Sequence, residues 1–265
     1  MGITPEPNFH GRRLIRELRS LRLRTGMNQH EAGARAHIDL QKLSRMETRQ
    51  LPTYHELCTM LDIYGVLSSD WDPYIELWDL ARRPPWWRQF GVKDPRYLRM
   101  EDEAILLYEF RLGHIPELLQ TREYARAMHA GLGEPAASTV VEVQLRRQQR
   151  VLDGKLAVYA LIHEPVLYQG ADRDQLIRLV ELAQLPTVTM QVVPQSTGLH
   201  GGLRTSLSLL SFADDEPDIA FTPTLTGVAE TQEPADITLV KRIIDSLAAQ
   251  AMTPRLSAVF IKDML

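Results

Sequence analysis

Apolar residues recur with helical spacing through the N-terminal part of the chain. Leu14, Leu18 and Leu21 fall on one face of a predicted helix, arginines occupy its other faces, and Gly26 ends the run. Asn28 then stands where a helix N-cap belongs, and a glutamate three residues later completes a capping-box pattern. The spacing therefore predicts two consecutive short helices.

The second of these helices is expected over residues 29–36, and Asp39 caps a third. In that third helix Leu43 and Met46 face inward at i, i+3 spacing. The remaining positions must point outward: Leu40, Gln41, Ser44 and Arg45. Thr53 repeats the capping-box pattern and begins a fourth helix.

Beyond this helical segment the periodicity is mixed. Amphipathic spacing predicts helices over residues 69–83, 101–112, 121–130, 139–152, 172–183, 234–251 and from 253 to the C-terminus. Short apolar runs predict strands over residues 156–162, 188–193, 206–212 and 219–222. The fold class is therefore α+β and predominantly helical. An all-α domain over residues 1–68 precedes a larger α+β domain over residues 69–265.

Composition excludes several classes of protein. Of the 265 residues 44% are hydrophobic and 24% are charged, which is typical of a folded globular protein. The single cysteine, Cys58, excludes a disulfide scaffold and a cysteine zinc cage and favours a reducing cytoplasm. No apolar run is long enough to span a membrane, and residues 1–7 lack the pattern of a targeting signal. We therefore expect a cytoplasmic protein with no membrane partner.

The net charge of −4 conceals an uneven distribution. Residues 1–66 hold ten Lys and Arg against seven Asp and Glu, whereas residues 67–265 hold 20 against 27. A basic N-terminal segment on an acidic body indicates that only the N-terminal segment meets a polyanion.

The basic segment resembles the Cro/repressor-type (XRE) helix-turn-helix. The matching features are the Asn28-Gln29 opening, Ile38 in the turn, and the Leu-Ser-Arg-Met-Glu close of the third helix over residues 43–47. The sequence departs from the family in two places: His37 stands where the family usually has glycine, and Thr48-Arg49 follows the closing glutamate. We expect His37 to adopt the left-handed backbone conformation.

The resemblance implies that the third helix enters the DNA major groove. The expected base contacts are those of Leu40, Gln41, Ser44 and Arg45, in which Gln41 pairs with adenine, Arg45 pairs with guanine and Leu40 touches a thymine methyl group. The expected phosphate or positioning contacts are those of Asn28, Gln29, Lys42 and Arg49. The resemblance also implies a structural salt bridge between Arg22 and Glu47. Double-stranded DNA, read by a homodimer at two half-sites, is thus the expected partner.

The acidic body resembles the C-terminal domain of actinobacterial regulators of the WhiJ type. The resemblance rests on residues 115–130, 156–169, 188–203 and 224–230 and on the RRQQRVLDG segment. Such regulators are similar to antitoxin-like proteins, which implies a small protein partner encoded nearby. We expect that partner to dock on the strand-rich segment over residues 188–226.

An enzyme or metal site is the competing hypothesis for the body. His163-Glu164 begins an HExxH-like pattern, but position 167 is Leu rather than His, and no phosphate loop or nucleophile elbow occurs. We therefore expect no catalytic residue, no metal and no cofactor. Three functions remain open: a transcription regulator, most simply a repressor; an antitoxin-like protein whose DNA binding serves autoregulation; and a hydrolase or ligand-modifying enzyme with a vestigial N-terminal domain.

Overall fold

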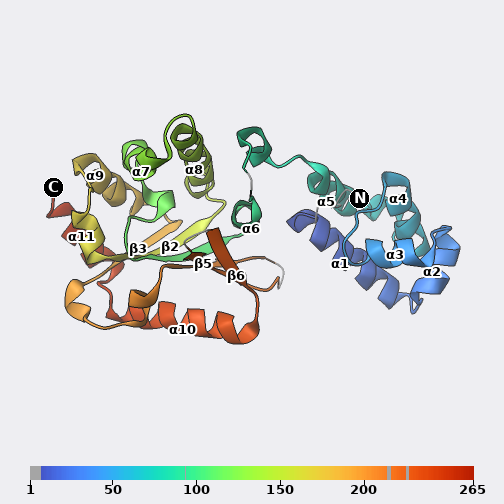
Figure 1. Cartoon of the computed structure of the whole chain (residues 1–265). Coiled ribbons are helices and arrows are strands. Elements are labelled where there is room, and N and C mark those ends of the chain that lie inside the picture. The colour runs from blue at the N-terminus through green and yellow to red at the C-terminus, as the bar shows by residue number, and fades with distance from the viewer. Residues whose placement is uncertain (1–6, 93, 214–215, 225–226) are drawn as a thin grey trace. The chain divides into compact units, whose positions relative to one another are not determined.

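The chain divides into an N-terminal unit, Met1–Trp86, with one hydrophobic core, and a C-terminal unit, Trp87–Leu265, with two (Figure 1). The computed structural model describes residues 7–92, 94–213, 216–224 and 227–265. Each unit builds its own core from its own helices or strands.

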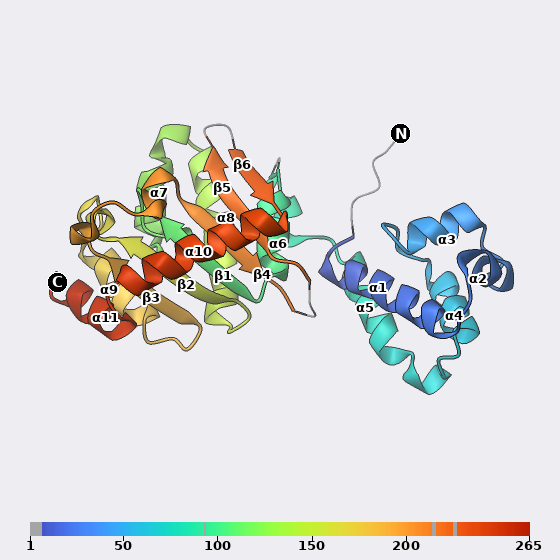
Figure 2. The same ribbon diagram turned by 90° about the horizontal axis from the view of Figure 1, so that it is seen from below.

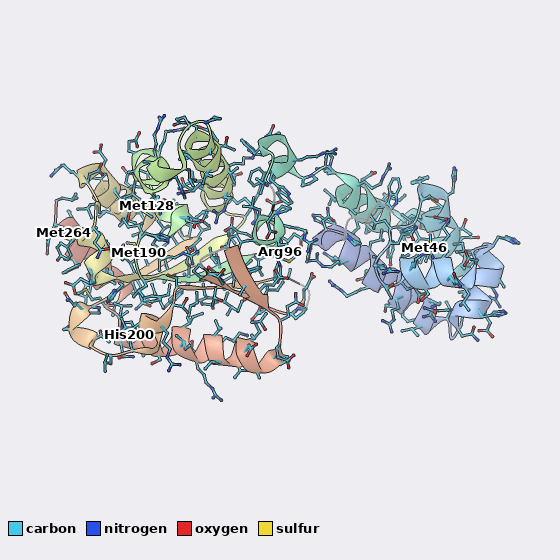
Figure 3. The ribbon with its side chains drawn as sticks, viewed as in Figure 1. Met46, Arg96, Met128, Met190, His200 and Met264 are labelled. Carbon is cyan, nitrogen blue, oxygen red and sulfur yellow. The ribbon has the colours of Figure 1, made fainter. Side chains whose placement is uncertain are left out.

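The described part of the N-terminal unit is entirely helical. Its elements are α1 (Phe9–Arg24), α2 (Gln29–Ala36), α3 (Leu40–Met46), α4 (Tyr54–Ile63), the 3₁₀ turn η1 (Ser68–Asp70) and α5 (Asp72–Arg82). Leucines of α1 and α4 and Met46 of α3 meet at its centre, where Figure 3 marks Met46. The four helices predicted from apolar spacing and capping residues are confirmed, with α2 at the predicted bounds.

This unit continues past Ser68, where the sequence placed the domain boundary. Helix α5 packs along α1, and the indole Nε1 of Trp78 donates to the carbonyl of Pro52 at 2.7 Å. The side chain of Asn8, which caps α1, donates to the carbonyl of Leu80 at 3.1 Å. Because α5 contributes to the N-terminal core, the two units separate at Trp86.

A six-stranded sheet with the order β3-β2-β1-β4-β5-β6 forms the C-terminal unit. The strands are β1 (Leu106–Arg111), β2 (Ala157–His163), β3 (Val188–Val193), β4 (Leu207–Ser211), β5 (Ile219–Thr224) and β6 (Gly227–Thr231). Strands β1, β2 and β3 are parallel, and the β4, β5 and β6 pairings are antiparallel. The sheet is therefore mixed, which fits the predicted α+β class.

Helices cover both faces of this sheet. They are α6 (Arg96–Glu103), α7 (Arg122–His129), α8 (Ala136–Leu152), α9 (Arg173–Leu182), α10 (Pro234–Gln250) and α11 (Pro254–Lys262). Short 3₁₀ turns connect them: η2 (Trp86–Phe90), η3 (Glu117–Leu119), η4 (Ala130–Leu132), η5 (Glu164–Tyr168), η6 (Gln195–Thr197) and η7 (Gly201–Arg204). Helices α7, α8 and α9 lie on one face, and α10 runs across the strands on the other (Figures 1 and 2).

One predicted element is wrong. The helix expected over residues 101–112 is instead the end of α6 followed by the central strand β1. Strand β1 alternates Leu107, Glu109 and Arg111 on one face with Tyr108 and Phe110 on the other, and its buried charges obscured the strand pattern. The exposed strand β6 was not predicted, and the helix expected over residues 69–83 starts with η1 before α5 begins.

Candidate nucleic-acid interface

The start of α2 is fixed by a reciprocal pair of hydrogen bonds. The side chain of Asn28 accepts from the backbone N–H of Glu31 at 2.9 Å, and the Glu31 carboxylate accepts from the backbone N–H of Asn28 at 2.9 Å. This is the capping box that the sequence predicts. The amide oxygen of Asn28 is therefore engaged in capping, as an anchor for the first turn of α2.

The turn between α2 and α3 depends on one close backbone approach. His37 adopts the left-handed conformation, φ 54° and ψ 36°, as expected for this position. The next residue, Ile38, donates its N–H to the carbonyl of Gly33 at 2.8 Å. A Cβ at Gly33 would lie 2.6 Å from the Ile38 carbonyl oxygen, so only glycine lets the turn fold back onto α2.

Helix α3 buries one face and exposes the other. Asp39 caps it by accepting the N–H of Lys42 at 3.0 Å, and Leu43 and Met46 are fully buried. The predicted base-contacting residues share the opposite face: Leu40, Gln41, Ser44 and Arg45. Gln41 and Arg45 are exposed, Leu40 is 48% exposed and Ser44 is half-buried. The structure therefore brings these four side chains to one accessible surface.

A buried ion pair ties α3 to α1. The Arg22 guanidinium donates to Glu47 through Nε to Oε1 at 2.6 Å and through Nη2 to Oε2 at 2.8 Å. Its Nη1 donates to the carbonyl of Met27 at 2.7 Å, and Gln29 donates its side-chain N–H to Glu47 Oε2 at 2.8 Å. The bridge expected between Arg22 and Glu47 is thus present, and Gln29 extends it to α2.

The side chains predicted to contact phosphates lie in different settings. Asn28 and Gln29 stand at the first turn of α2, and Arg49 is exposed just after α3. Lys42 is ion-paired with Glu56 of α4, a partner that the sequence did not reveal. Burial raises the pKa of Glu56, but the hydrogen bonds from Lys42 and Thr53 outweigh it and hold that pKa below its ordinary value.

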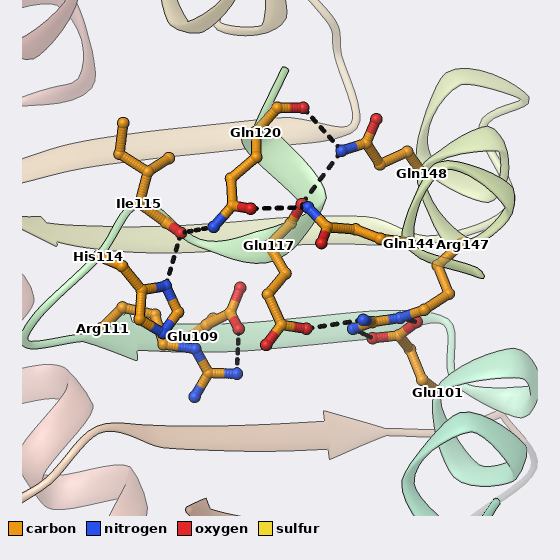
Figure 4. A network of polar contacts seen from close by, with 10 residues as sticks. All are labelled: Glu101, Glu109, Arg111, His114, Ile115, Glu117, Gln120, Gln144, Arg147 and Gln148. Atoms are coloured by element: carbon orange, nitrogen blue, oxygen red, sulfur yellow. Dashed lines mark hydrogen bonds and ion pairs between the residues drawn. The ribbon is translucent and has the colours of Figure 1, made fainter. Parts of the chain in front are cut away.

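The C-terminal unit contains a buried polar network that the sequence did not predict (Figure 4). Arg147 of α8 binds both oxygens of Glu101 at 2.7 Å each, and its Nη1 donates to Glu117 at 2.6 Å. On the central strand, Arg111 pairs with Glu109 at 2.5 Å, and both side chains are nearly fully buried. No local pattern could reveal this network, because its members come from α6, β1, η3 and α8.

Nearby arginines offset the cost of burying the carboxylates of this network. Burial opposes ionisation of Glu117, yet the positive charges of Arg147 and Arg111 lower its pKa to about 2. Burial raises the pKa of Glu109, which the charge of Arg111 offsets only in part. Among the described residues, no group of three or more His, Cys, Asp or Glu side chains is placed to hold a metal ion.

Comparisons with known proteins match the two units of the chain to two different domains. A helix-turn-helix domain matches residues 13–70, and a domain of unknown function, DUF5753, matches residues 95–263. No curated protein matches the chain. Within the described residues, no helix is long and apolar enough to cross a membrane. The N-terminal helix-turn-helix is the domain of a DNA-binding regulator, and the chain as a whole belongs to the DUF5753 family.

Proposed function

We propose that this protein is a sequence-specific transcriptional regulator of the XRE type that places α3 in the DNA major groove. The observation that carries this proposal is that α3 is held in place on one side and exposed on the other. Arg22, Glu47 and Gln29 fix α3 against α1 and α2, while Leu40, Gln41 and Arg45 remain accessible. A rigid helix with an exposed polar face is what base reading in the groove requires.

Each side chain on the exposed face has a chemical role. Gln41 can donate and accept in a bidentate pair with adenine, and Arg45 can donate twice to guanine. Leu40 supplies apolar contact with a thymine methyl group, and Ser44 a single hydrogen bond. Asn28, Gln29, Lys42 and Arg49 then position the helix through phosphates.

A single helix of this size contacts few bases, so specificity requires two copies. We infer that the protein acts as a homodimer on half-sites about 10 bp apart, which matches one helical turn of DNA. Occupancy of such a site near a promoter blocks polymerase, so repression is the expected sign of regulation.

Footprinting of the full chain on its own upstream region tests this proposal. We expect two protected half-sites one helical turn apart, lost in Gln41→Ala and retained in Arg242→Ala, an exposed arginine of α10. Protection of random fragments with equal affinity would contradict sequence-specific regulation.

We propose a second role for the C-terminal unit, as the docking domain of a small partner protein in an antitoxin-like pair. Support comes from the sheet edges. Strand β6 is exposed along its length, whereas the β3 edge is closed where Val192 donates to Ser257 Oγ and accepts from the Met252 N–H. The docking segment predicted from the sequence, residues 188–226, includes the closed β3 edge and ends at positions 225–226, which lie outside the described residues, whereas the exposed edge strand β6 follows that segment. Co-purification of the full chain with the product of a small adjacent gene tests this role, and failure of the two to associate would contradict it.

A further inference from the structure

A pocket of about 600 Å³ lies within the N-terminal unit. One wall is formed by α1, and the other by the segment that leads from Tyr64 into α5. The volume is within the range of about 300–1,000 Å³ that holds small ligands. The proposed DNA contacts leave this pocket without a role.

Three charged side chains of α1 line the pocket, and two of opposite sign, Glu17 and Arg24, lie on either side of an apolar centre. Glu17 and Arg24 both line the pocket, and among the described residues neither has an ion-pair or hydrogen-bond partner. They are seven residues apart, so they lie on one helix face with about 10 Å between them along the axis. Leu21, 5% exposed, lies between them. Arg13 and Asp70 also line the pocket, and the lining therefore carries no net formal charge.

The opposite wall is preformed and mostly apolar, with Asp70 as its charged side chain. Val66 and Leu77 line it, and the backbone of Val66 is held on both sides. Its N–H donates to the Leu61 carbonyl at 3.0 Å, and its carbonyl accepts from the indole of Trp71 at 3.0 Å. Tyr64, also on this wall, is only 5% exposed, yet in the described chain its hydroxyl has no hydrogen-bond partner. A buried hydroxyl without a partner is uncommon, and because this oxygen is itself inaccessible, a ligand can reach it only when the ring moves.

We propose that this pocket binds a short apolar peptide through its two free ends. The peptide's ammonium group pairs with Glu17 and its carboxylate with Arg24, while its side chains pack on Leu21 and Leu77. An extended peptide of about three residues spans about 10 Å, which matches the separation of the two charges. A zwitterion also matches a lining without net charge. On binding, the Tyr64 ring turns toward the pocket, and its otherwise buried hydroxyl hydrogen-bonds the peptide backbone.

Tyr64 also connects the pocket to the DNA-reading helix. Tyr64 belongs to the same buried core cluster as Leu43 and Met46 of α3. Burial and, next, the negative charge of Glu47 raise the pKa of Tyr64 to about 12. A peptide that moves Tyr64 therefore acts on the ion pair that holds α3. This regulatory half of the inference rests on the proposed function; peptide binding itself does not.

Calorimetric titration of the full chain with trileucine tests the binding site. Its matched control is N-acetyl-trileucine amide, which keeps the apolar side chains and removes both end charges. We expect saturable one-to-one binding of trileucine and at least about tenfold weaker binding of the blocked peptide. Glu17→Gln and Arg24→Gln should each weaken trileucine binding by about tenfold, whereas Val259→Asn, in the separate groove between α9 and α11, should leave it unchanged.

Tyr64→Phe gives an independent check. Because the hydroxyl has no hydrogen-bond partner among the residues that the structure describes, its removal should leave the unfolding midpoint unchanged but weaken trileucine binding. Equal affinity for free and blocked peptides, or no saturable binding up to about 1 mM trileucine, would overturn the proposal. Trileucine that binds as expected without changing DNA affinity would overturn only the regulatory half. Loss of specific DNA binding in the absence of peptide would contradict the proposed function instead.

Discussion

Arg22 and Glu47 are 25 positions apart in the sequence, yet they form a doubly hydrogen-bonded ion pair whose side chains are 7% and 1% exposed. Both charges are buried away from water, so each needs the other to offset its lost hydration. Because Glu47 is the C-cap residue of α3 and Arg22 lies in α1, the pair fixes the orientation of α3 relative to α1.

Removing one member of this pair should be costly. Glu47→Ala leaves a buried guanidinium without a counter-charge, and we expect the N-terminal unit to lose about 3–5 kcal/mol of unfolding free energy. Denaturant unfolding followed by circular dichroism measures this loss. Glu142→Ala, which breaks an exposed pair with Arg122, should cost no more than about 1 kcal/mol. Equal effects of the two substitutions would show that the buried Arg22–Glu47 pair stabilises the protein no more than an exposed pair does.

Gly33→Ala should also damage the N-terminal unit. The new Cβ would meet the Ile38 carbonyl oxygen at 2.6 Å, so the turn must shift and carry α3 with it. We expect a loss of about 1–3 kcal/mol in thermal unfolding together with weaker DNA binding. Ala34→Ser, an exposed change in the same helix, is the control and should have little effect on either measurement. Wild-type behaviour of Gly33→Ala would show that the turn is not tightly closed.

Base-reading and phosphate-binding residues should respond differently to substitution. Arg45→Ala should cost about 1–3 kcal/mol at the specific site and relax preference at one base pair. Lys42→Ala should weaken binding to all sequences and reduce the salt slope by about one. Its charge is shared with Glu56, so the loss on random DNA should be smaller than for Arg49→Ala. Equal losses of Arg45→Ala on specific and random DNA would show that Arg45 reads no base.

The buried network predicts the acid sensitivity of the C-terminal unit. The pKa of Glu117 falls from 4.5 to about 2 on folding, so its ionised form stabilises the folded state above pH 4.5. That stabilisation is lost as the pH falls from 4.5 through about 2. It is at most about 3 kcal/mol, and solvent screening reduces it because the Glu117 side chain is 33% exposed.

Unfolding of Glu117→Gln across this pH range measures that contribution, and a flatter pH dependence than wild type is expected. Glu109→Gln is the matched control, because burial raises the pKa of Glu109 and its ionisation therefore adds no stability as the pH rises. This substitution should not flatten the pH dependence, although it should lower overall stability because buried Arg111 loses its counter-charge. An unchanged slope in Glu117→Gln would contradict the charge balance described for the network.

Local signals in the sequence predicted the N-terminal unit well. Asn28, Asp39 and Thr53 each cap the helix that follows, because capping depends only on residues a few positions apart. The left-handed conformation of His37 was likewise expected from a single position. The exposed face of α3 follows from the inward spacing of Leu43 and Met46.

Long-range relationships could not be predicted in the same way. Arg147 lies 46 positions from Glu101, and the alternation of β1 is disguised because Glu109 and Arg111 occupy buried positions that are usually apolar. The Lys42–Glu56 pair and the unpartnered hydroxyl of Tyr64 also depend on how helices pack. These features could be identified only from the three-dimensional structure.

The claim that α3 enters the major groove is tested most directly by DNA cleavage from a tethered reagent. Cys58 is the only cysteine, so Cys58→Ser with Thr48→Cys places a single thiol for an iron chelate just after α3, and Cys58→Ser with Ser246→Cys places one on α10 as the control. We predict that the Thr48→Cys conjugate cleaves within two half-sites about one helical turn apart. Uniform cleavage along the fragment, or cleavage equal to that of the α10 control, would contradict the claim.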